Sequence, residues 1–394
     1  MAKEFFISLY LSVFYIFFSI FKAFPQKKKT ILIASFGDNI LFTLKELERQ
    51  TDDQVVVLKT SQCKTDFGPE QMTLDFETIN IFDWIRSVYH IATAEKVIVD
   101  NYFAFLAVTN FKPNAQCVQL WHAAGAIKQF ALKDPSIENR SSQAYNRFRT
   151  VYNRFDYVAV GSEKMAGIFK ESFAVENSRI LRSGIPRTDF FFDSGAVKQA
   201  KQHVEEQYPA IQGKKVILYA PTYRDNELNV SKLHLNIDKM YREFKGEYIL
   251  MLRLHPAVNG HFQNKYPGFV VNVSSYSNIN HLLVTTDILV TDYSSIPFEF
   301  ALLHKPMIFF AYDREQYAES RGFWEDYEEL VPGPVVETTR EVIDVIQNDK
   351  YNLQQIQRFA DVWNQYSKGN ASENLVRSLY TEDADVKTAV KVQS

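Results

Sequence analysis

The residue in this 394-residue sequence best suited to proton transfer is a histidine that follows an apolar segment. His122 lies in the run QLWHAAG (119–125), directly after a predicted strand. The ordinary pKa of histidine suits proton transfer near neutrality, and the small residues that follow let a ligand approach the backbone. The sequence therefore offers His122 as a general base. The alternative is a histidine that caps the following helix or packs beside Trp121.

A second histidine ends another apolar run. Arg253 and His255 are two positions apart in the segment RLHP, so on a strand their side chains would share one face. A guanidinium fork and an imidazole N–H can both bind a diphosphate. Two further predicted strands end in cationic segments, GIPRTD (184–189) and APTYRD (220–225). Each could be an ordinary turn, but together they indicate an anion-binding site.

The segment DYSSIPFEF (292–300) combines two serines with the predicted start of a helix. The free backbone N–H groups and positive dipole of a helix start, with the hydroxyls of Ser294 and Ser295, are suited to binding phosphate. Glu299 is one turn further on, where a carboxylate could accept hydrogen bonds from a ribose. In the alternative interpretation Ser295 is an ordinary N-cap and Glu299 a first-turn carboxylate.

These residues need a scaffold that brings strand ends together, and the hydrophobic pattern predicts one. From Thr30 onward short apolar runs alternate with polar helical stretches, which is typical of βαβ units with parallel sheets. The runs of the first half are 31–34, 55–58, 96–100, 117–120, 157–160 and 180–182, and those of the second half are 216–219, 248–254, 269–273, 287–291 and 307–312. Ligands of such sheets bind beyond the carboxyl ends of the strands, where the polar motifs fall.

The predicted fold is therefore α/β, with two doubly wound Rossmann-like domains that face a cleft and an N-terminal membrane-associating helix. A polar segment after Asp193 separates the two series of strands. The expected divisions are 1–29 as an apolar segment, 30–200 as the N-terminal domain and 201–394 as the C-terminal domain, which includes the C-terminal helices.

Composition excludes several classes of protein. The 44 Lys and Arg residues against 47 Asp and Glu leave a net charge of −3, which excludes a basic nucleic-acid binder. Two cysteines exclude a disulfide scaffold. The absence of a P-loop, of Gly-x-Gly-x-x-Gly and of zinc-ligand spacing predicts no cofactor and no resident metal. An Asp287/Asp292 pair that holds Mg²⁺ is the alternative.

The N-terminus is unusually aromatic. Residues 5–21 form an uncharged run of 17, close to the lower limit of about 17 residues for a membrane span. No small-x-small cleavage site follows, and the cluster Lys27–Lys29 suits an anionic membrane leaflet. We expect an anchor that lies in the membrane plane. A membrane span and a buried core helix are the alternatives.

Five segments, in order along the chain, resemble the CDP-glycerol glycerophosphotransferase family of wall teichoic acid synthesis. They are WHAAG…K, SGIPRTD, LYAPTYRDN, RLHP and DILVTDYSSIPFEF, and the resemblance covers about residues 30–366. It implies a glycosyltransferase-B type fold, with an N-terminal acceptor domain and a C-terminal CDP-glycerol-binding domain. It also implies a peripheral protein on the cytoplasmic side of the cell membrane.

The resemblance assigns roles to individual residues. It implies that His122 is the catalytic base and that His255 is a second catalytic histidine near the diphosphate. The implied CDP-glycerol-binding residues are Arg187, Pro221, Thr222, Arg253, Ser294, Ser295 and Glu299. Ala123 departs from the family pattern, because many relatives have glycine there. Its methyl group restricts the backbone but leaves the N–H available.

The short chain, its apolar N-terminus and the segment DNYF (100–103) are similar to priming members of the family. This implies transfer of one glycerol phosphate from CDP-glycerol to the N-acetylmannosamine of undecaprenyl-diphosphate-linked N-acetylmannosaminyl-N-acetylglucosamine, with release of CMP. The implied partners are CDP-glycerol, that lipid-linked acceptor, the membrane and other wall-assembly enzymes, with no nucleic acid. The alternatives are a second-unit or polymerising glycerol- or ribitol-phosphate transferase, a sugar-nucleotide glycosyltransferase and a non-enzymatic scaffold.

Overall fold

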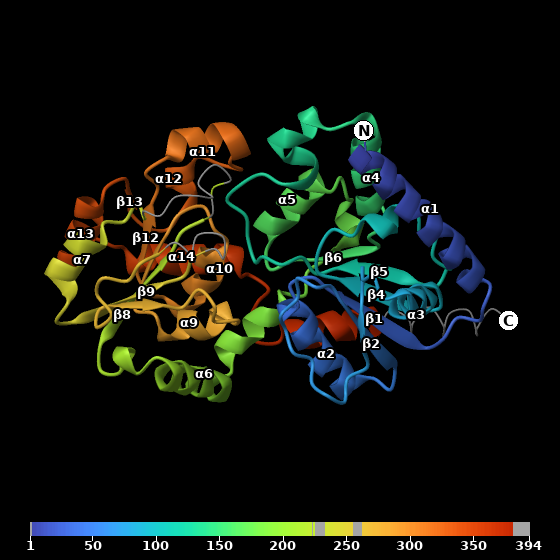
Figure 1. Ribbon diagram of the computed structural model, residues 1–394, viewed down its shortest axis with the longest axis horizontal. Coiled ribbons are helices and arrows are strands. Elements are labelled where there is room, and N and C mark those ends of the chain that lie inside the picture. The colour runs from blue at the N-terminus through green and yellow to red at the C-terminus, as the bar shows by residue number, and fades with distance from the viewer. Residues whose placement is uncertain (1, 223, 225–232, 255–261, 381–394) are drawn as a thin grey trace. The chain divides into compact units, whose positions relative to one another are not determined.

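The computed structural model describes residues 2–222, 224, 233–254 and 262–380 (Figure 1). The chain forms two compact units. The first consists of Met1–Ala124, Phe130–Asp189 and Gln365–Ser394, and the second of Gly125–Gln129 and Phe190–Asn364. Each unit is built around one parallel sheet, which confirms the predicted α/β fold with two doubly wound halves.

The sheet of the first unit has the strand order β3-β2-β1-β4-β5-β6-β7. Its strands are β1 (Lys29–Ala34), β2 (Gln54–Lys59), β3 (Thr73–Asp75), β4 (Lys96–Val99), β5 (Gln116–Gln119), β6 (Tyr157–Ala159) and β7 (Ile180–Leu181). Every residue of β1 and β4 is buried, as expected of strands covered on both faces. The strand order reverses between β1 and β4, and ligands of such sheets bind beside that reversal.

The first unit also contains several helices and 3₁₀ turns. They are α1 (Ala2–Lys22), α2 (Asp38–Gln50), α3 (Ile81–Ala92), α4 (Ser142–Tyr152) and α5 (Glu163–Ser172), with 3₁₀ turns η1 (Ala104–Ala107), η2 (Ala131–Lys133), η3 (Pro135–Asn139), η4 (Asn177–Arg179) and η5 (Pro186–Phe192), the last of which runs into the second unit. Asn80, Ser141 and Ser162 begin α3, α4 and α5 as N-caps, because their side-chain oxygens accept backbone N–H bonds that the first turn leaves unpaired.

The apolar N-terminal run forms the helix α1, so the prediction of an N-terminal helix is confirmed. Among the described residues, one helix is long and apolar enough to cross a membrane, Glu4–Lys22, with a mean hydropathy of 1.9. One face of α1 packs on α3 and η1: the ring of Phe14 is stacked on that of Phe105, with 5.0 Å between centroids, and meets Trp84 edge-on. Arg147 of α4 donates two hydrogen bonds to the carboxylate of Glu4.

The end of the chain returns to the first unit. Residues 371–380 are helical, and Leu375, Val376 and Leu379 are buried in the same apolar core as β1. Tyr380 donates a hydrogen bond of 2.7 Å to Asp53. The sequence pattern assigns these residues to the C-terminal domain, whereas the structure groups residues from 365 onward with the first unit. The apolar stripe of this helix is the same whichever sheet it covers, so a local pattern does not distinguish the two sheets.

The sheet of the second unit has the strand order β10-β9-β8-β11-β12-β13. Its strands are β8 (Lys215–Ala220), β9 (Tyr248–Leu252), β10 (Val270–Asn272), β11 (Ile288–Thr291), β12 (Met307–Phe310) and β13 (Val335–Val336). The order reverses between β8 and β11, so the segments that follow these two strands lie side by side. Both carry motifs that the sequence singled out.

The helices of the second unit complete its core, of which β8, β9 and α7 supply many residues. They are α6 (Ser194–Gln207), α7 (Ile237–Phe244), α9 (Ile279–Thr285), α10 (Ile296–Phe300), α11 (Arg314–Arg321), α12 (Tyr327–Leu330), α13 (Thr339–Gln347) and α14 (Leu353–Trp363), with 3₁₀ turns η6 (Pro209–Ile211) and η8 (Ala301–Leu303). A capping box between Thr338 and Glu341 begins α13.

Candidate active site

His122 lies just beyond β5, on a segment that Leu120 anchors in the core. The imidazole Nδ1 is 3.3 Å from the backbone carbonyl oxygen of Asp100, which follows the neighbouring strand β4. A carbonyl oxygen only accepts hydrogen bonds, so in this contact Nδ1–H is the donor and the ring lone pair is on Nε2. This tautomer is the one that a general base acting through Nε2 requires.

Two aromatic rings hold the plane of this imidazole. The ring of Phe36 is nearly parallel to it at 4.0 Å between centroids, and the indole of Trp121 is at 4.3 Å. Two rings at these separations cannot share one face of an imidazole without overlapping, so they cover opposite faces. The remaining freedom of His122 is rotation within its own plane, and the hydrogen bond to Asp100 opposes that rotation.

Asp100 also holds the loop that carries Phe36. Its carboxylate accepts hydrogen bonds from the backbone N–H groups of Ser35 (2.8 Å), Phe36 (2.9 Å) and Gly37 (2.7 Å). Burial raises the pKa of Asp100 to about 6, although the three N–H bonds favour the charged form. The backbone and side chain of Asp100 therefore orient the imidazole and one of the rings that stack on it.

Arg187 belongs to the same unit as His122. Its backbone N–H donates to Asn39 Oδ1 at 3.0 Å, and its guanidinium, 8% exposed, is 3.6 Å from a carboxylate oxygen of Asp38. The amide nitrogen of Asn39 donates in turn to the carbonyl oxygen of Trp121 at 2.9 Å. The structure thus ties the segments that carry His122 and Arg187, 65 positions apart in the sequence, to one amide side chain.

In the second unit, the segments after β8 and β11 are tied together. The backbone N–H of Thr222, which with Pro221 follows β8, donates to Asp292 Oδ1 at 2.7 Å. The hydroxyl of Thr291 donates to Ala220 O, so the 3.0 Å contact between Thr291 and Ser294 is a hydrogen bond donated by Ser294. Both lone pairs of Ser294 Oγ are therefore available to a ligand that donates a hydrogen bond.

Two other hydroxyls at these strand ends have no hydrogen bond that explains their position. Thr222 Oγ1 is buried and has no partner among the described residues. Ser295 is the N-cap residue of α10, but its side chain makes no capping bond, contrary to the ordinary N-cap interpretation. Glu299, one turn further on, is 2% exposed. A buried hydroxyl without a partner is costly unless a bound group satisfies it.

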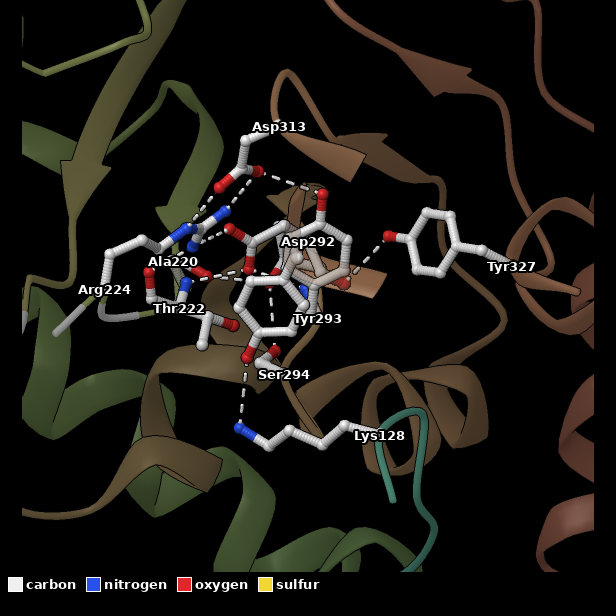
Figure 2. Close-up of polar contacts among 11 residues, drawn as sticks. Lys128, Ala220, Thr222, Arg224, Asp292, Tyr293, Ser294, Asp313 and Tyr327 are labelled. Carbon is white, nitrogen blue, oxygen red and sulfur yellow. Dashed lines mark hydrogen bonds and ion pairs between the residues drawn. The ribbon is translucent and has the colours of Figure 1, made fainter. Parts of the chain in front are cut away.

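Arg224 is the central polar residue of this half-site, and the sequence marked it only as one of several cations. Figure 2 shows its guanidinium between two carboxylates. Nε and Nη2 donate to Asp313 at 2.9 and 2.8 Å, and Nη1 donates to Asp292 at 2.6 Å. Burial opposes the charge of Asp313, but hydrogen bonds from Arg224 outweigh it and hold the pKa of Asp313 below its usual value. Arg224 also donates to the backbone carbonyl oxygen of Thr222, so it links the end of β8 to both carboxylates.

Arg253 is also engaged by the protein. Its Nη1 donates to the backbone carbonyl of Val273 at 3.1 Å and to that of Tyr276, so it ties the end of β9 to the segment after β10. The other expected residue of this strand end, His255, lies outside the described residues. The geometry therefore shows one role of Arg253 that the sequence did not indicate, a structural bond between neighbouring strand ends.

The segment that follows His122 joins the second unit. Lys128 forms an antiparallel bridge with Phe323, and its Nζ donates to the hydroxyl of Tyr317 at 3.4 Å. An alanine at Gly125 would place its Cβ 2.3 Å from the ring of Phe298. The WHAAG…K motif therefore spans both units, and its glycine is required for close packing.

The described residues contain no cluster of three or more potential metal ligands. Asp287 precedes β11 and accepts a hydrogen bond from Val216 N–H at 2.8 Å, whereas Asp292 follows the same strand and pairs with Arg224. The two carboxylates lie at opposite ends of β11, so they do not form the single magnesium site considered from the sequence.

The fold and these motifs define a family. The profile of CDP-glycerol:poly(glycerophosphate) glycerophosphotransferase matches residues 16–381, so the chain belongs to this family. It is 36% identical over 359 residues to the teichoic acid glycerol-phosphate primase of Bacillus subtilis (strain 168), covering 90% of this chain and 92% of that protein. It is 34% identical to the teichoic acid poly(ribitol-phosphate) polymerase of Bacillus spizizenii (strain W23), covering 96% of this chain but 60% of that protein.

Solved structures share the fold. The wall teichoic acid polymerase TagF superposes with a TM-score of 0.81 at 23% identity, covering 98% of this chain and 99% of that one. A UDP-GlcNAc 2-epimerase from Neisseria meningitidis has a TM-score of 0.60 at 15% identity, with 90% of this chain and all of that one covered. The predicted family and fold are both confirmed.

Proposed function

We propose that this protein primes wall teichoic acid synthesis. It transfers glycerol phosphate from CDP-glycerol to the N-acetylmannosamine of an undecaprenyl-diphosphate-linked N-acetylmannosaminyl-N-acetylglucosamine and releases CMP. Similarity to a primase over about nine tenths of both chains supports the choice within the family. The observation that carries the chemistry is the hydrogen bond of His122 Nδ1 to Asp100 O, which leaves the lone pair on Nε2.

In this mechanism the acceptor hydroxyl gives its proton to His122 Nε2. The oxygen attacks the glycerol-bearing phosphorus of CDP-glycerol, the bond from that phosphorus to the bridging oxygen breaks, and CMP leaves. Such a phosphoryl transfer depends mainly on alignment and on stabilisation of charge. The stacked rings of Phe36 and Trp121 hold the base in the orientation that alignment requires.

The donor is held, in this proposal, by the strand ends described above. Thr222 and Ser295 supply hydroxyls near the start of α10, and a phosphate there would satisfy Thr222 Oγ1, which has no partner among the described residues. Ser294, whose proton is donated to Thr291, would accept a hydrogen bond from a hydroxyl of CDP-glycerol. The remaining proposed CDP-glycerol-binding residues are Arg187, Pro221, Arg253 and Glu299, with His255 as the second catalytic histidine. Charge that develops on the diphosphate would be stabilised by the hydroxyls of Thr222 and Ser295 and by the guanidinium groups of Arg187 and Arg253.

Mass analysis of the product tests the proposal. The full chain is incubated with the synthetic lipid-linked disaccharide and a large excess of CDP-glycerol, and CMP release is measured in parallel. A primase adds one glycerol phosphate per acceptor. A ladder of many units would identify a polymerase, and release of CMP without lipid product would exclude this acceptor.

A ribitol-phosphate primase is the second candidate. A relative of that name from Bacillus spizizenii (strain W23) is 29% identical over 92% of this chain and 94% of its own length. The same assay with CDP-ribitol in place of CDP-glycerol distinguishes the two. A ratio of kcat/KM that favours CDP-ribitol would assign the protein to this alternative.

We also propose that α1 lies in the plane of the cytoplasmic membrane surface. Its inner face is buried on the first unit, with Phe14 and Phe18 at 0% and 1% exposed, whereas Phe6 and Ile16 on its outer face are more than half exposed. In a spanning orientation, Phe14 would lose its contacts with Phe105 and Trp84, and the ion pair between Glu4 and Arg147 would break. An in-plane helix keeps both and buries the outer face in lipid.

Substitution of the outer face tests this orientation. The variant with Leu9→Glu and Ile16→Glu leaves the packed face intact, so it should fold normally yet lose binding to vesicles that contain anionic lipid. The variant with Leu353→Glu and Val362→Glu on α14 controls for added charge, because both residues are apolar and 49% exposed but lie in the second unit. Unchanged flotation of the α1 variant with vesicles would place the membrane contact elsewhere.

A further inference from the structure

The residue before His122 has an unusual backbone conformation. Trp121 has φ = +58°, in the left-handed region that bulky side chains rarely adopt. This torsion sets the direction in which the chain delivers His122 beyond β5. A strained torsion persists only where the surroundings hold it, so the groups that hold Trp121 also control the position of His122.

Two buried amide side chains hold the backbone of Trp121. Gln119 Oε1 accepts its N–H at 2.8 Å, and Asn39 Nδ2 donates to its carbonyl oxygen at 2.9 Å. Gln119 and Asn39 are 0% and 3% exposed. That carbonyl belongs to the peptide group that joins Trp121 to His122. Asn39 therefore binds the peptide group directly before the residue that carries the imidazole.

Asn39 also contacts a second motif. Its Oδ1 accepts the backbone N–H of Arg187 at 3.0 Å, while its own backbone carbonyl is held by the hydroxyl of Thr43 at 2.8 Å. One planar amide therefore fixes the distance between the segment that carries His122 and the segment that carries Arg187. Its nitrogen binds the segment that carries His122, and its oxygen binds the segment that carries Arg187.

We propose that Asn39 is a positioning residue for the transfer reaction. Its Nδ2 orients the peptide group before His122, and its Oδ1 holds the Arg187 segment at a fixed distance from that peptide group. This inference rests on the proposed function for its kinetic consequences. Asn39 touches no reacting atom. Its loss therefore lowers turnover by misplacing the base, and a displacement of about 1 Å costs about 10²-fold in rate.

The two bonds of Asn39 can be removed separately. Asn39→Asp keeps an oxygen for the Arg187 N–H but loses the donor to Trp121, so kcat should fall about 10²-fold while KM for CDP-glycerol stays within about threefold. Asn39→Leu loses both bonds without adding charge, so kcat should fall similarly and KM should also rise. Gln71→Glu is the control, because Gln71 Nε2 donates to the backbone carbonyls of Val55 and Met72, remote from His122.

A readout independent of catalysis accompanies the kinetics. In protein with ¹⁵N-labelled histidine, the ring resonances of His122, identified by their loss in His122→Ala, should shift in both Asn39 variants and stay in place in Gln71→Glu. Normal kcat in folded Asn39→Asp and Asn39→Leu, or unshifted His122 resonances, would overturn the inference. If the wild-type protein transfers no glycerol phosphate, the proposed function fails, and the His122 resonances still decide the positioning role.

Discussion

Replacing Arg224 by methionine should destabilise the second unit by about 3–5 kcal/mol, the usual cost of leaving buried charges unpaired. Asp292 is 1% exposed and would lose its only guanidinium contact in the described chain, while Asp313 would lose two hydrogen bonds. Methionine retains much of the apolar volume of the side chain, so the lost stability is due mainly to the missing charge. In a unit of about 180 residues, such a loss lowers Tm by roughly 6–20 °C.

The loss of stability in Arg224→Met should also depend on pH. In the wild-type protein, Arg224 holds the pKa of Asp313 low, so this stabilisation is present at neutral pH and is lost as the pH falls through the folded pKa. In Arg224→Met that stabilisation is absent, because the guanidinium that lowers the pKa of Asp313 has been removed. The difference in free energy of unfolding between the two proteins should therefore stay nearly constant from pH 7 to pH 5 and narrow below the ordinary aspartate pKa of 3.8.

Calorimetry of the full chain at pH 7 and at about pH 3 measures the effect. Arg314→Met is the matched control, because Arg314 pairs with the exposed Glu328. Its effect should stay within about 0.5 kcal/mol. A loss below about 1 kcal/mol for Arg224→Met, or one equal at the two pH values, would refute the assignment of Arg224 as the buried partner of both carboxylates.

Three further predictions concern other parts of the chain. His122→Ala should lower kcat by about 10²–10⁴-fold with little change in donor affinity, and near-normal CMP release would remove it from the base role. Gly184→Ala should destabilise the protein by more than about 2 kcal/mol, because φ is +89° and the new Cβ would lie 2.5 Å from the carbonyl oxygen of Tyr366. Gly213→Ala, at φ = +69° with nothing within 4 Å of the Cβ, should cost only about 1 kcal/mol in urea unfolding, and equal losses would contradict the steric argument. Burial, and secondly the charge of Lys27, lowers the pKa of Lys29 to about 8 from an ordinary 10.5. Between pH 8 and pH 10.5 the unfolded chain therefore binds more protons than the folded protein, so the free energy of unfolding should rise with pH in this range. Lys29→Met should abolish that rise in urea titrations at pH 8 and pH 10, and an unchanged slope would exclude Lys29 as its source.

The strands and the motifs at their ends were predictable because they are local features. A buried parallel strand is a short β-branched run whatever its neighbours are, and the predicted runs 31–34, 96–100 and 117–120 correspond to β1, β4 and β5. The rule that ligands bind beyond carboxyl ends then selected His122 without knowledge of the strand order. The apolar run at the N-terminus likewise predicts a helix in any environment.

The partners of those residues depended on which strands became neighbours. Asp100, Asn39 and Phe36 lie 22, 83 and 86 positions from His122, and no spacing in the sequence connects them. They meet because β1, β4 and β5 are adjacent in the sheet. The sequence marked Asp100 only through the similarity of segment 100–103 to relatives, and it carried no signal for Asn39 or Phe36.

The same distinction applies to the charged residues and to α1. The sequence by itself determined that Arg224 follows a buried strand and that α1 is apolar on nearly every side. Only the tertiary structure decided that Arg224 pairs with Asp292 and Asp313, and that Phe14 rather than Phe6 is buried. The physical reason is that hydrophobicity along a chain reports what must leave water, whereas the burial of a particular face or charge depends on the surface that the rest of the fold places against it.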